Sequence, residues 1–196
     1  MAVSLDGVSS GPNQRLDAPM GDGIDDHLHR WMFETPEENA EVIDALVGRD
    51  AYVMGRNMFD PGRGPFDPAW RGWWGEEPPY HAPVFVLTHH EREPLEMAGG
   101  TTFHFVTTGL DDALAQARAV AGEDGTIGVA GGASTLRACL AAGVVDEVTL
   151  SVAPFVAGAG ERPLDGLAGL GLELVRTRGA SLVSHLTYRV VAPPPS

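Results

Sequence analysis

The sequence contains no lysine, and its basic residues are 13 arginines set against 27 aspartates and glutamates. The formal net charge is therefore −14 at pH 7. Binding to nucleic acid or to an anionic lipid surface requires clustered positive charge, so this composition argues against both classes of partner. An anionic small molecule could bind only where arginine side chains or backbone amides are concentrated.

Cysteine and long apolar runs are scarce as well. Cys139 is the only cysteine, which excludes an internal disulfide, and its spacing from Leu136 and Leu140 predicts a buried thiol on a helix. No apolar stretch reaches the roughly 18 residues of a membrane span, and no charged and then apolar leader follows Met1. We therefore expect a cytoplasmic protein. The 7 histidines show no spacing with cysteines or carboxylates that completes a metal site, so we expect no metal.

The rest of the composition favours one folded domain. The chain has 196 residues, of which 43% are hydrophobic, and this is enough to bury one substantial core. We predict a single domain over residues 1–191. A disordered proline-rich tail is predicted over residues 192–196, because proline cannot donate a hydrogen bond to a strand.

Apolar segments alternate with amphipathic segments along the chain, a pattern typical of an α/β fold built on one sheet. Capping residues and apolar spacing predict helices over 36–47, 110–121 and 134–142. Short segments rich in β-branched and aromatic residues predict central strands over 51–55, 84–88, 102–106, 126–130 and 147–156. Polar and apolar residues alternate over 172–177 and 184–191, which predicts a C-terminal antiparallel hairpin.

Two long segments, 7–25 and 60–83, show neither the periodicity of a helix nor that of a strand. The second carries Trp70, Trp73 and Trp74, and each tryptophan would expose a large apolar surface unless it packed on the protein. We therefore expect this segment to fold over the body of the domain. Long loops of this kind are commonly functional, so the three tryptophans, together with Leu28, are candidate substrate contacts.

Two short phrases indicate a dinucleotide site. Val129–Leu136 reads as a strand that turns through Gly131 and Gly132 into a helix, so it presents bare backbone amides at a helix N-terminus, where phosphate oxygens bind well. Val53–Met58 reads as a second strand end, and it adds the guanidinium fork of Arg56. Alone, a glycine pair is more often a tight turn; the combination with Arg56 is what points to phosphate.

The order of several motifs makes the chain similar to the family of RibD C-terminal and dihydrofolate reductase-like proteins. The matching phrases are Ser4-Leu5-Asp6-Gly7-Val8, Met54-Gly55-Arg56-Asn57-Met58, Val86-Leu87-Thr88-His89, Gly131-Gly132-Ala133-Ser134 and Ala142-Gly143-Val144-Val145-Asp146-Glu147-Val148. The resemblance covers essentially the whole chain, from Met1 to about Val191. It implies a mostly parallel, twisted central sheet of about eight strands with flanking helices, beginning with a strand near Met1–Ser4, and NADPH bound across the carboxyl ends of the strands.

The same resemblance implies where the cofactor binds. Gly55 and Arg56, together with Asn57 and Met58 that follow them in the chain, are expected near the cofactor phosphates. Thr88 and His89 are expected near the adenosine 2′-phosphate. The turn formed by Gly131, Gly132, Ala133, Ser134 and Thr135 is expected beneath the pyrophosphate.

The predicted activity is hydride transfer from NADPH to a C=N or C=O group of a pyrimidine- or pterin-like heterocycle, for which the protein supplies position, a dry pocket and a proton. Asp26, beside Asp25 at an apparent helix start, and Asp6 are the candidate catalytic carboxylates; Asp6 is also interpreted as a binding residue. Riboflavin-pathway reductases usually carry a glutamate where this chain has Ala130, so the substrate stays open. By family analogy we expect a homodimer. Two alternatives are a non-catalytic nucleotide-binding dimer and a true dihydrofolate reductase.

Overall fold

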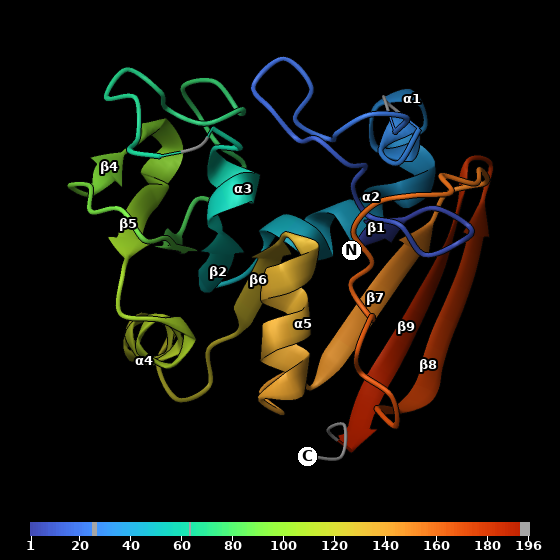
Figure 1. Ribbon diagram of the computed structural model, residues 1–196. Coiled ribbons are helices and arrows are strands. Elements are labelled where there is room, and N and C mark those ends of the chain that lie inside the picture. The colour runs from blue at the N-terminus through green and yellow to red at the C-terminus, as the bar shows by residue number, and fades with distance from the viewer. Residues whose placement is uncertain (25–26, 63, 193–196) are drawn as a thin grey trace. The chain divides into compact units, whose positions relative to one another are not determined.

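The computed structural model describes residues 1–24, 27–62 and 64–192, and the chain divides into two compact units (Figure 1). The terminal unit consists of Met1–Ala40 and Ala133–Ser196. The middle unit is Glu41–Gly132. The first boundary between the two units, after Ala40, falls within helix α2 (Pro36–Val47).

The middle unit contains a five-stranded sheet in the order β4-β5-β3-β2-β6. Its strands are β2 (Ala51–Gly55), β3 (Pro83–Leu87), β4 (Leu95–Glu96), β5 (Thr102–Val106) and β6 (Ile127–Gly131). Neighbouring strands are parallel except for the edge strand β4, which is antiparallel to β5. The carboxyl ends of the parallel strands therefore lie along one edge of this sheet.

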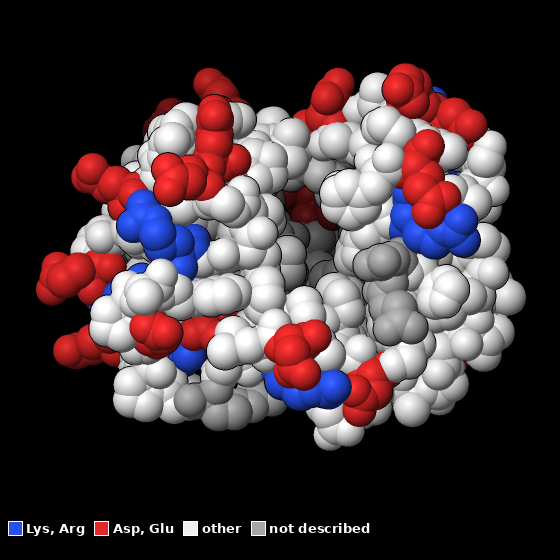
Figure 2. All heavy atoms as spheres, turned by 90° about the horizontal axis from the view of Figure 1, so that it is seen from above, with Lys and Arg blue, Asp and Glu red and all other residues white. Residues whose placement is uncertain are grey.

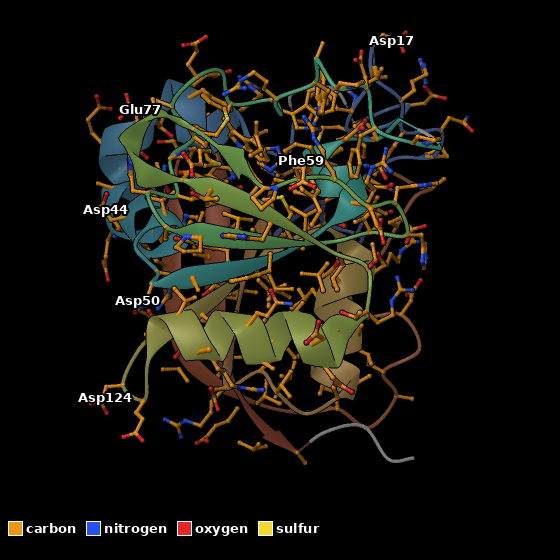
Figure 3. All side chains as sticks on the ribbon, turned by 90° about the vertical axis from the view of Figure 1, so that its left-hand side faces the viewer. Asp17, Asp44, Asp50, Phe59, Glu77 and Asp124 are labelled. Atoms are coloured by element: carbon orange, nitrogen blue, oxygen red, sulfur yellow. The ribbon has the colours of Figure 1, made fainter. Side chains whose placement is uncertain are left out.

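Helix α4 (Leu110–Ala121) lies along one face of the sheet (Figure 3). Its buried residues, Ala113, Leu114 and Ala117, recur at helical spacing and form its apolar side. The helix is flanked by Gly109 and Gly122, whose φ angles of 105° and 80° are positive and cost least at glycine. Phe59, labelled in Figure 3, lies on the other side of the strands from α4, in the short helix α3 (Arg56–Phe59) that directly follows β2.

The tryptophan-bearing segment packs on the middle unit, as predicted. Trp74 stacks on Phe103 of β5 with ring centroids 5.6 Å apart. The indole Nε1 of Trp70 donates a 2.8 Å hydrogen bond to the carbonyl of Phe59. Both rings pack against a buried cluster on the α3 side of the sheet. The cluster comprises Tyr52, Met54, Phe59, Tyr80, Ala82, Val84, Val86, Met97 and Phe103.

The terminal unit contains a four-stranded sheet in the order β1-β7-β9-β8. Its strands are β1 (Ala2–Val3), β7 (Glu147–Val152), β8 (Gly171–Ala180) and β9 (Val183–Ala192). Strand β1 is parallel to β7, and the other pairs are antiparallel. The long β8-β9 hairpin confirms the predicted C-terminal pair. The helices of the terminal unit are α1 (Arg30–Glu34) and α5 (Ala133–Ala141), in addition to the first turn of α2.

A buried polar network joins three elements of the terminal unit. His185 of β9 contacts the Ser151 hydroxyl through Nδ1 and the Asn39 side-chain oxygen through Nε2, each at 2.9 Å. The Asn39 amide nitrogen donates to the carbonyls of Thr35 and Trp31, which fixes its orientation. His185 Nε2 must therefore carry a proton, and burial lowers the pKa of this imidazole. The neutral ring consequently ties α2 to the sheet.

The α/β fold, the parallel central strands and the flanking helices agree with the predictions. The strands are, however, divided between two hydrogen-bonded sheets instead of one, with β1 and β7 in the terminal unit. Cys139 is buried, as predicted, and burial raises the pKa of its thiol to about 11. The single domain over residues 1–191 stays a prediction. Of the predicted tail, Ala192 instead ends β9, and residues 193–196 lie outside the described part of the chain.

Among the described residues, none of the helices has the length and apolar character to cross a membrane. Over the same described ranges, no group of three or more histidine, cysteine, aspartate or glutamate side chains comes together as a possible metal site.

Candidate functional site

The order of strands in the middle unit contains a topological switch point between β2 and β6. From β2 the chain proceeds to β3 and then β5 on one side, and it returns to place β6 on the other side of β2. In open α/β sheets, ligands bind outside the carboxyl ends of the strands at such a point, because the connections leave in opposite directions there. The topology therefore places a candidate site beyond Gly55 and Gly131.

The glycine-rich turn after β6 lies at this position. Gly131 pairs with Met54 of β2, directly after an irregularity in the register, and its φ of 115° lies in the region that favours glycine. Gly132 follows through a cis peptide bond. A Cβ atom added at Gly132 would meet no other atom within 4 Å, so a ligand can approach the backbone closely.

Helix α5 begins directly after this turn, at Ala133. The first backbone amides of a helix have no partner within it, and the helix dipole adds positive character, so a phosphate is favoured there. Ser134 is exposed in the first turn, whereas Thr135 is only 5% exposed and packs inward. The predicted strand–glycine–helix arrangement is therefore present, with α5 beginning one residue earlier than expected.

Arg56 follows β2 at the same edge, but its guanidinium is engaged within the protein. One terminal nitrogen donates to the Asp60 carboxylate at 2.9 Å and to the Gly62 carbonyl at 3.3 Å. The other donates to the Gly64 carbonyl at 3.0 Å. The Phe66 ring covers the guanidinium, 3.7 Å from Cζ to the ring centroid. The fork that the sequence suggested for phosphate is thus occupied by the segment that follows it.

Arg92, which the sequence reasoning missed, anchors the same segment from the loop after β3. Its guanidinium lies over the rings of Phe59, Phe66 and Phe105, 5.2–5.6 Å from their centroids. It also donates a 2.6 Å hydrogen bond to the Trp70 carbonyl, and burial lowers its pKa. No sequence motif marks this role, because the aromatic rings come from three separate segments.

Thr88 and His89 follow β3 and lie beside the end of β2, since Leu87 pairs with Gly55. The Thr88 hydroxyl accepts a hydrogen bond from the His90 amide at 3.1 Å and shapes the turn. His89 is exposed. Asn57 is also exposed in α3, and Met58 packs against the buried cluster of the middle unit. The fold therefore brings the predicted cofactor residues of β2, β3 and β6 to one sheet edge; their contacts with a cofactor stay predictions.

The candidate substrate residues divide between the two units. Trp70 and Trp73 meet edge to face, with centroids 4.5 Å apart, and both keep part of their surface exposed. Leu28 is 0% exposed and packs with Val8, Ile24 and Ala153 in the terminal unit. Leu28 is therefore a core residue of this unit, and its contact with a substrate stays a prediction.

Asp6 is a structural anion of the terminal unit. Its carboxylate accepts hydrogen bonds from the Ser4 hydroxyl at 2.7 Å and from the amides of Ala157 and Gly158 at 2.9 Å each. The hydrogen bond from Ser4 and those from the backbone amides lower the pKa of Asp6 well below its usual range. A proton donor usually needs a raised pKa, so these contacts favour the binding role of Asp6 over the catalytic one, and both roles stay predictions. Asp25 and Asp26 lie outside the described residues.

The charge distribution offers little general attraction for an anion. On the face shown in Figure 2, acidic side chains are widespread and arginines occupy few places. Ala130, at the position where a glutamate was expected from the family, is partly buried against the cluster of the middle unit. Backbone amides at the β6–α5 turn are therefore the main positive feature of the candidate site.

The chain is similar to known proteins over most of its length. The model of the RibD C-terminal domain matches residues 1–183, so the chain belongs to that family, which is a family of reductases. No curated protein matches the chain.

Three solved structures share the fold at low identity. A putative riboflavin biosynthesis protein from Shewanella sp. PV-4 is 22% identical, with a TM-score of 0.61 over 98% of this chain and 97% of that one. RibD from Acinetobacter baumannii is 15% identical, with a TM-score of 0.61, and the match covers 97% of this chain but only 56% of that protein. Dihydrofolate reductase from Enterococcus faecalis, solved with NADP(H), is 15% identical, with a TM-score of 0.54 over 80% and 83% of the two chains.

Proposed function

Starting from this family membership, we propose that the protein is an NADPH-dependent reductase that transfers hydride to a C=N or C=O group of a pyrimidine- or pterin-like heterocycle. The observation that carries the proposal is the switch point between β2 and β6, where the Gly131–Gly132 turn leads directly into α5. This is an arrangement suited to a dinucleotide pyrophosphate.

The residues present fit such a cofactor. Open space beside Gly132 lets phosphate oxygens reach the backbone, and the first amides of α5 donate to them. Thr88 and His89 lie at the neighbouring strand end, where we assign the adenosine 2′-phosphate. When bound, NADPH supplies the hydride. The protein binds the cofactor, orients it and keeps water away from the reacting groups.

The tryptophan-bearing segment is the reason for proposing an aromatic heterocycle as the substrate. Trp70 and Trp73 meet edge to face and are both partly exposed, and an aromatic ring is a suitable contact for a flat ligand. Ala130 cannot accept a hydrogen bond through its side chain as a glutamate would, which disfavours the ribosylaminopyrimidine of the riboflavin pathway. Asp26 stays the proposed proton donor, since Asp6 is held as an anion.

A non-catalytic nucleotide-binding protein with the same fold is the second candidate. The apolar Ala130 and the structural role of Asp6 favour it, because both remove groups expected to act on a substrate. A homodimer is proposed for either function by family analogy. True dihydrofolate reduction is a narrower form of the first proposal.

Calorimetry with NADPH and NADH, followed by steady-state oxidation of NADPH, tests the proposal. The substrates are dihydrofolate, the ribosylaminopyrimidine and a panel of quinones, and displacement by methotrexate tests for a pterin site. Turnover with any substrate supports the reductase. Tight binding of NADPH without turnover supports the second candidate, and the absence of saturable NADPH binding contradicts both.

A further inference from the structure

The ion pair between Arg56 and Asp60 lies at the edge where the proposed cofactor phosphates bind. The Arg56 and Asp60 side chains are 14% and 5% exposed, and the two charged atoms are 2.9 Å apart. A pair that is shielded from water is screened by salt less than a surface pair. Arg56 is thus held by a nearly buried anion one helical turn further along the chain.

The hydrogen bonds leave Arg56 no free fork for a phosphate. Both terminal nitrogens donate to groups of the following segment, namely the Asp60 carboxylate and the carbonyls of Gly62 and Gly64. The Phe66 ring covers one face of the guanidinium. Bidentate binding of a phosphate needs two parallel N–H donors. One terminal nitrogen already donates twice, the other donates to Gly64, and Nε is buried without a partner.

We propose that Asp60 is an internal counter-ion that competes with the ligand's phosphates for Arg56. The inference rests on the proposed function for the identity of the ligand, a phosphate-bearing nucleotide. Ligand binding then shifts Arg56 from Asp60 to the ligand, because a pyrophosphate carries at least two negative charges and a carboxylate carries one. Only molecules in which Arg56 has left Asp60 bind with full affinity, so the internal pair lowers the apparent affinity by the fraction of such molecules.

The competition also involves the tryptophan-bearing segment. Asp60 accepts a 2.7 Å hydrogen bond from the Gly62 amide, and Trp70 is bonded to the carbonyl of Phe59, the residue before Asp60. Release of Arg56 from Asp60 therefore changes the surroundings of Trp70. Tryptophan emission reports this change when the ligand itself does not absorb, as with inorganic pyrophosphate.

Asp60→Asn is the direct test, with Asp67→Asn as the matched control. Asparagine keeps an oxygen for the Gly62 amide but presents an NH₂ group to Arg56 in place of the anionic oxygen. Asp67 is exposed and accepts from the Ala69 amide, so its replacement removes the same charge from the same segment without touching Arg56. Affinities for inorganic pyrophosphate and NADPH are measured by calorimetry, and folding is checked by thermal melting.

The proposal predicts that Asp60→Asn binds pyrophosphate about tenfold more tightly than the wild type. Asp67→Asn stays within about twofold of the wild type, since its carboxylate does not hold Arg56. Pyrophosphate changes the tryptophan emission of the wild type, and Asp60→Asn shows much of that change before any ligand is added. Equal or weaker binding by Asp60→Asn overturns the proposal, because Asp60 would then position Arg56 or serve the fold alone.

Phe66→Leu provides a second route if Asp60→Asn fails to fold. It removes the ring from the guanidinium without altering any charge, and it is expected to tighten pyrophosphate binding severalfold; unchanged or weaker binding contradicts the competition. The same measurements distinguish failure of the proposed function from failure of the competition. A wild type that binds pyrophosphate but not NADPH refutes the cofactor, while the ratio between variants still decides the role of Asp60. If no variant binds pyrophosphate, the competition is refuted.

Discussion

Replacement of Ser134 by aspartate separates the proposed phosphate site from the stability of the fold. Ser134 is exposed in the first turn of α5, where an acidic residue is compatible with the helix dipole and should not destabilise the helix. A bound pyrophosphate would meet the new carboxylate at close range. The same substitution is therefore harmless to the protein and unfavourable to the ligand.

The magnitude follows from Coulomb's law. Two unit charges about 6 Å apart repel by about 1.4 kcal/mol at an effective dielectric constant of about 40, and a pyrophosphate carries two such charges. Screening by salt reduces the total to about 2 kcal/mol. We expect Ser134→Asp to weaken NADPH binding roughly 30-fold, and the loss should shrink as the salt concentration rises.

Ala138→Asp is the matched control, since Ala138 is exposed on the same helix one turn further from the glycine pair. It adds an equal charge but leaves the first turn unchanged, so NADPH binding should weaken much less. Both variants are titrated with NADPH by calorimetry at two salt concentrations, beside thermal melts. Unchanged affinity in Ser134→Asp, or an equal loss in both variants, would refute a phosphate site at the β6–α5 turn.

Three further predictions concern stability. His185→Gln should flatten the acid side of the curve of unfolding free energy against pH. The pKa of His185 is lowered in the folded state, so its contribution to stability is complete above the unfolded pKa of about 6.5 and is lost as the pH falls below that value. Urea unfolding at several pH values checks this, and identical slopes for both proteins would contradict it. Trp70→Phe removes the hydrogen bond to the Phe59 carbonyl and should cost about 1 kcal/mol of unfolding free energy in denaturant melts, and no loss would deny the bond a role. Leu28→Ala, at a fully buried position, should cost about 2–5 kcal/mol in the same assay, whereas a nearly unchanged stability would place Leu28 outside the core.

Local patterns in the sequence were sufficient for most elements and for the glycine-rich turn at the candidate site. Helix α4 was predicted to its terminal residues because its signals, namely the apolar spacing, the start at Thr108 and Asp111 and the stop at Gly122, all act within or beside the segment itself. The Gly131–Gly132 turn was recognisable because glycine meets a backbone requirement that few other residues satisfy. Short elements without strong local signals, such as α3, were not predicted.

Tertiary structure alone decided what the charged side chains do. Nothing local distinguishes an arginine that binds phosphate from Arg56, which bonds to Asp60 and lies beneath Phe66. Asp6 likewise owes its lowered pKa partly to amides about 150 residues away in the chain, at Ala157 and Gly158. Backbone conformation depends on neighbours in sequence, whereas the partner of a charge depends on which distant segments the fold brings within hydrogen-bonding distance.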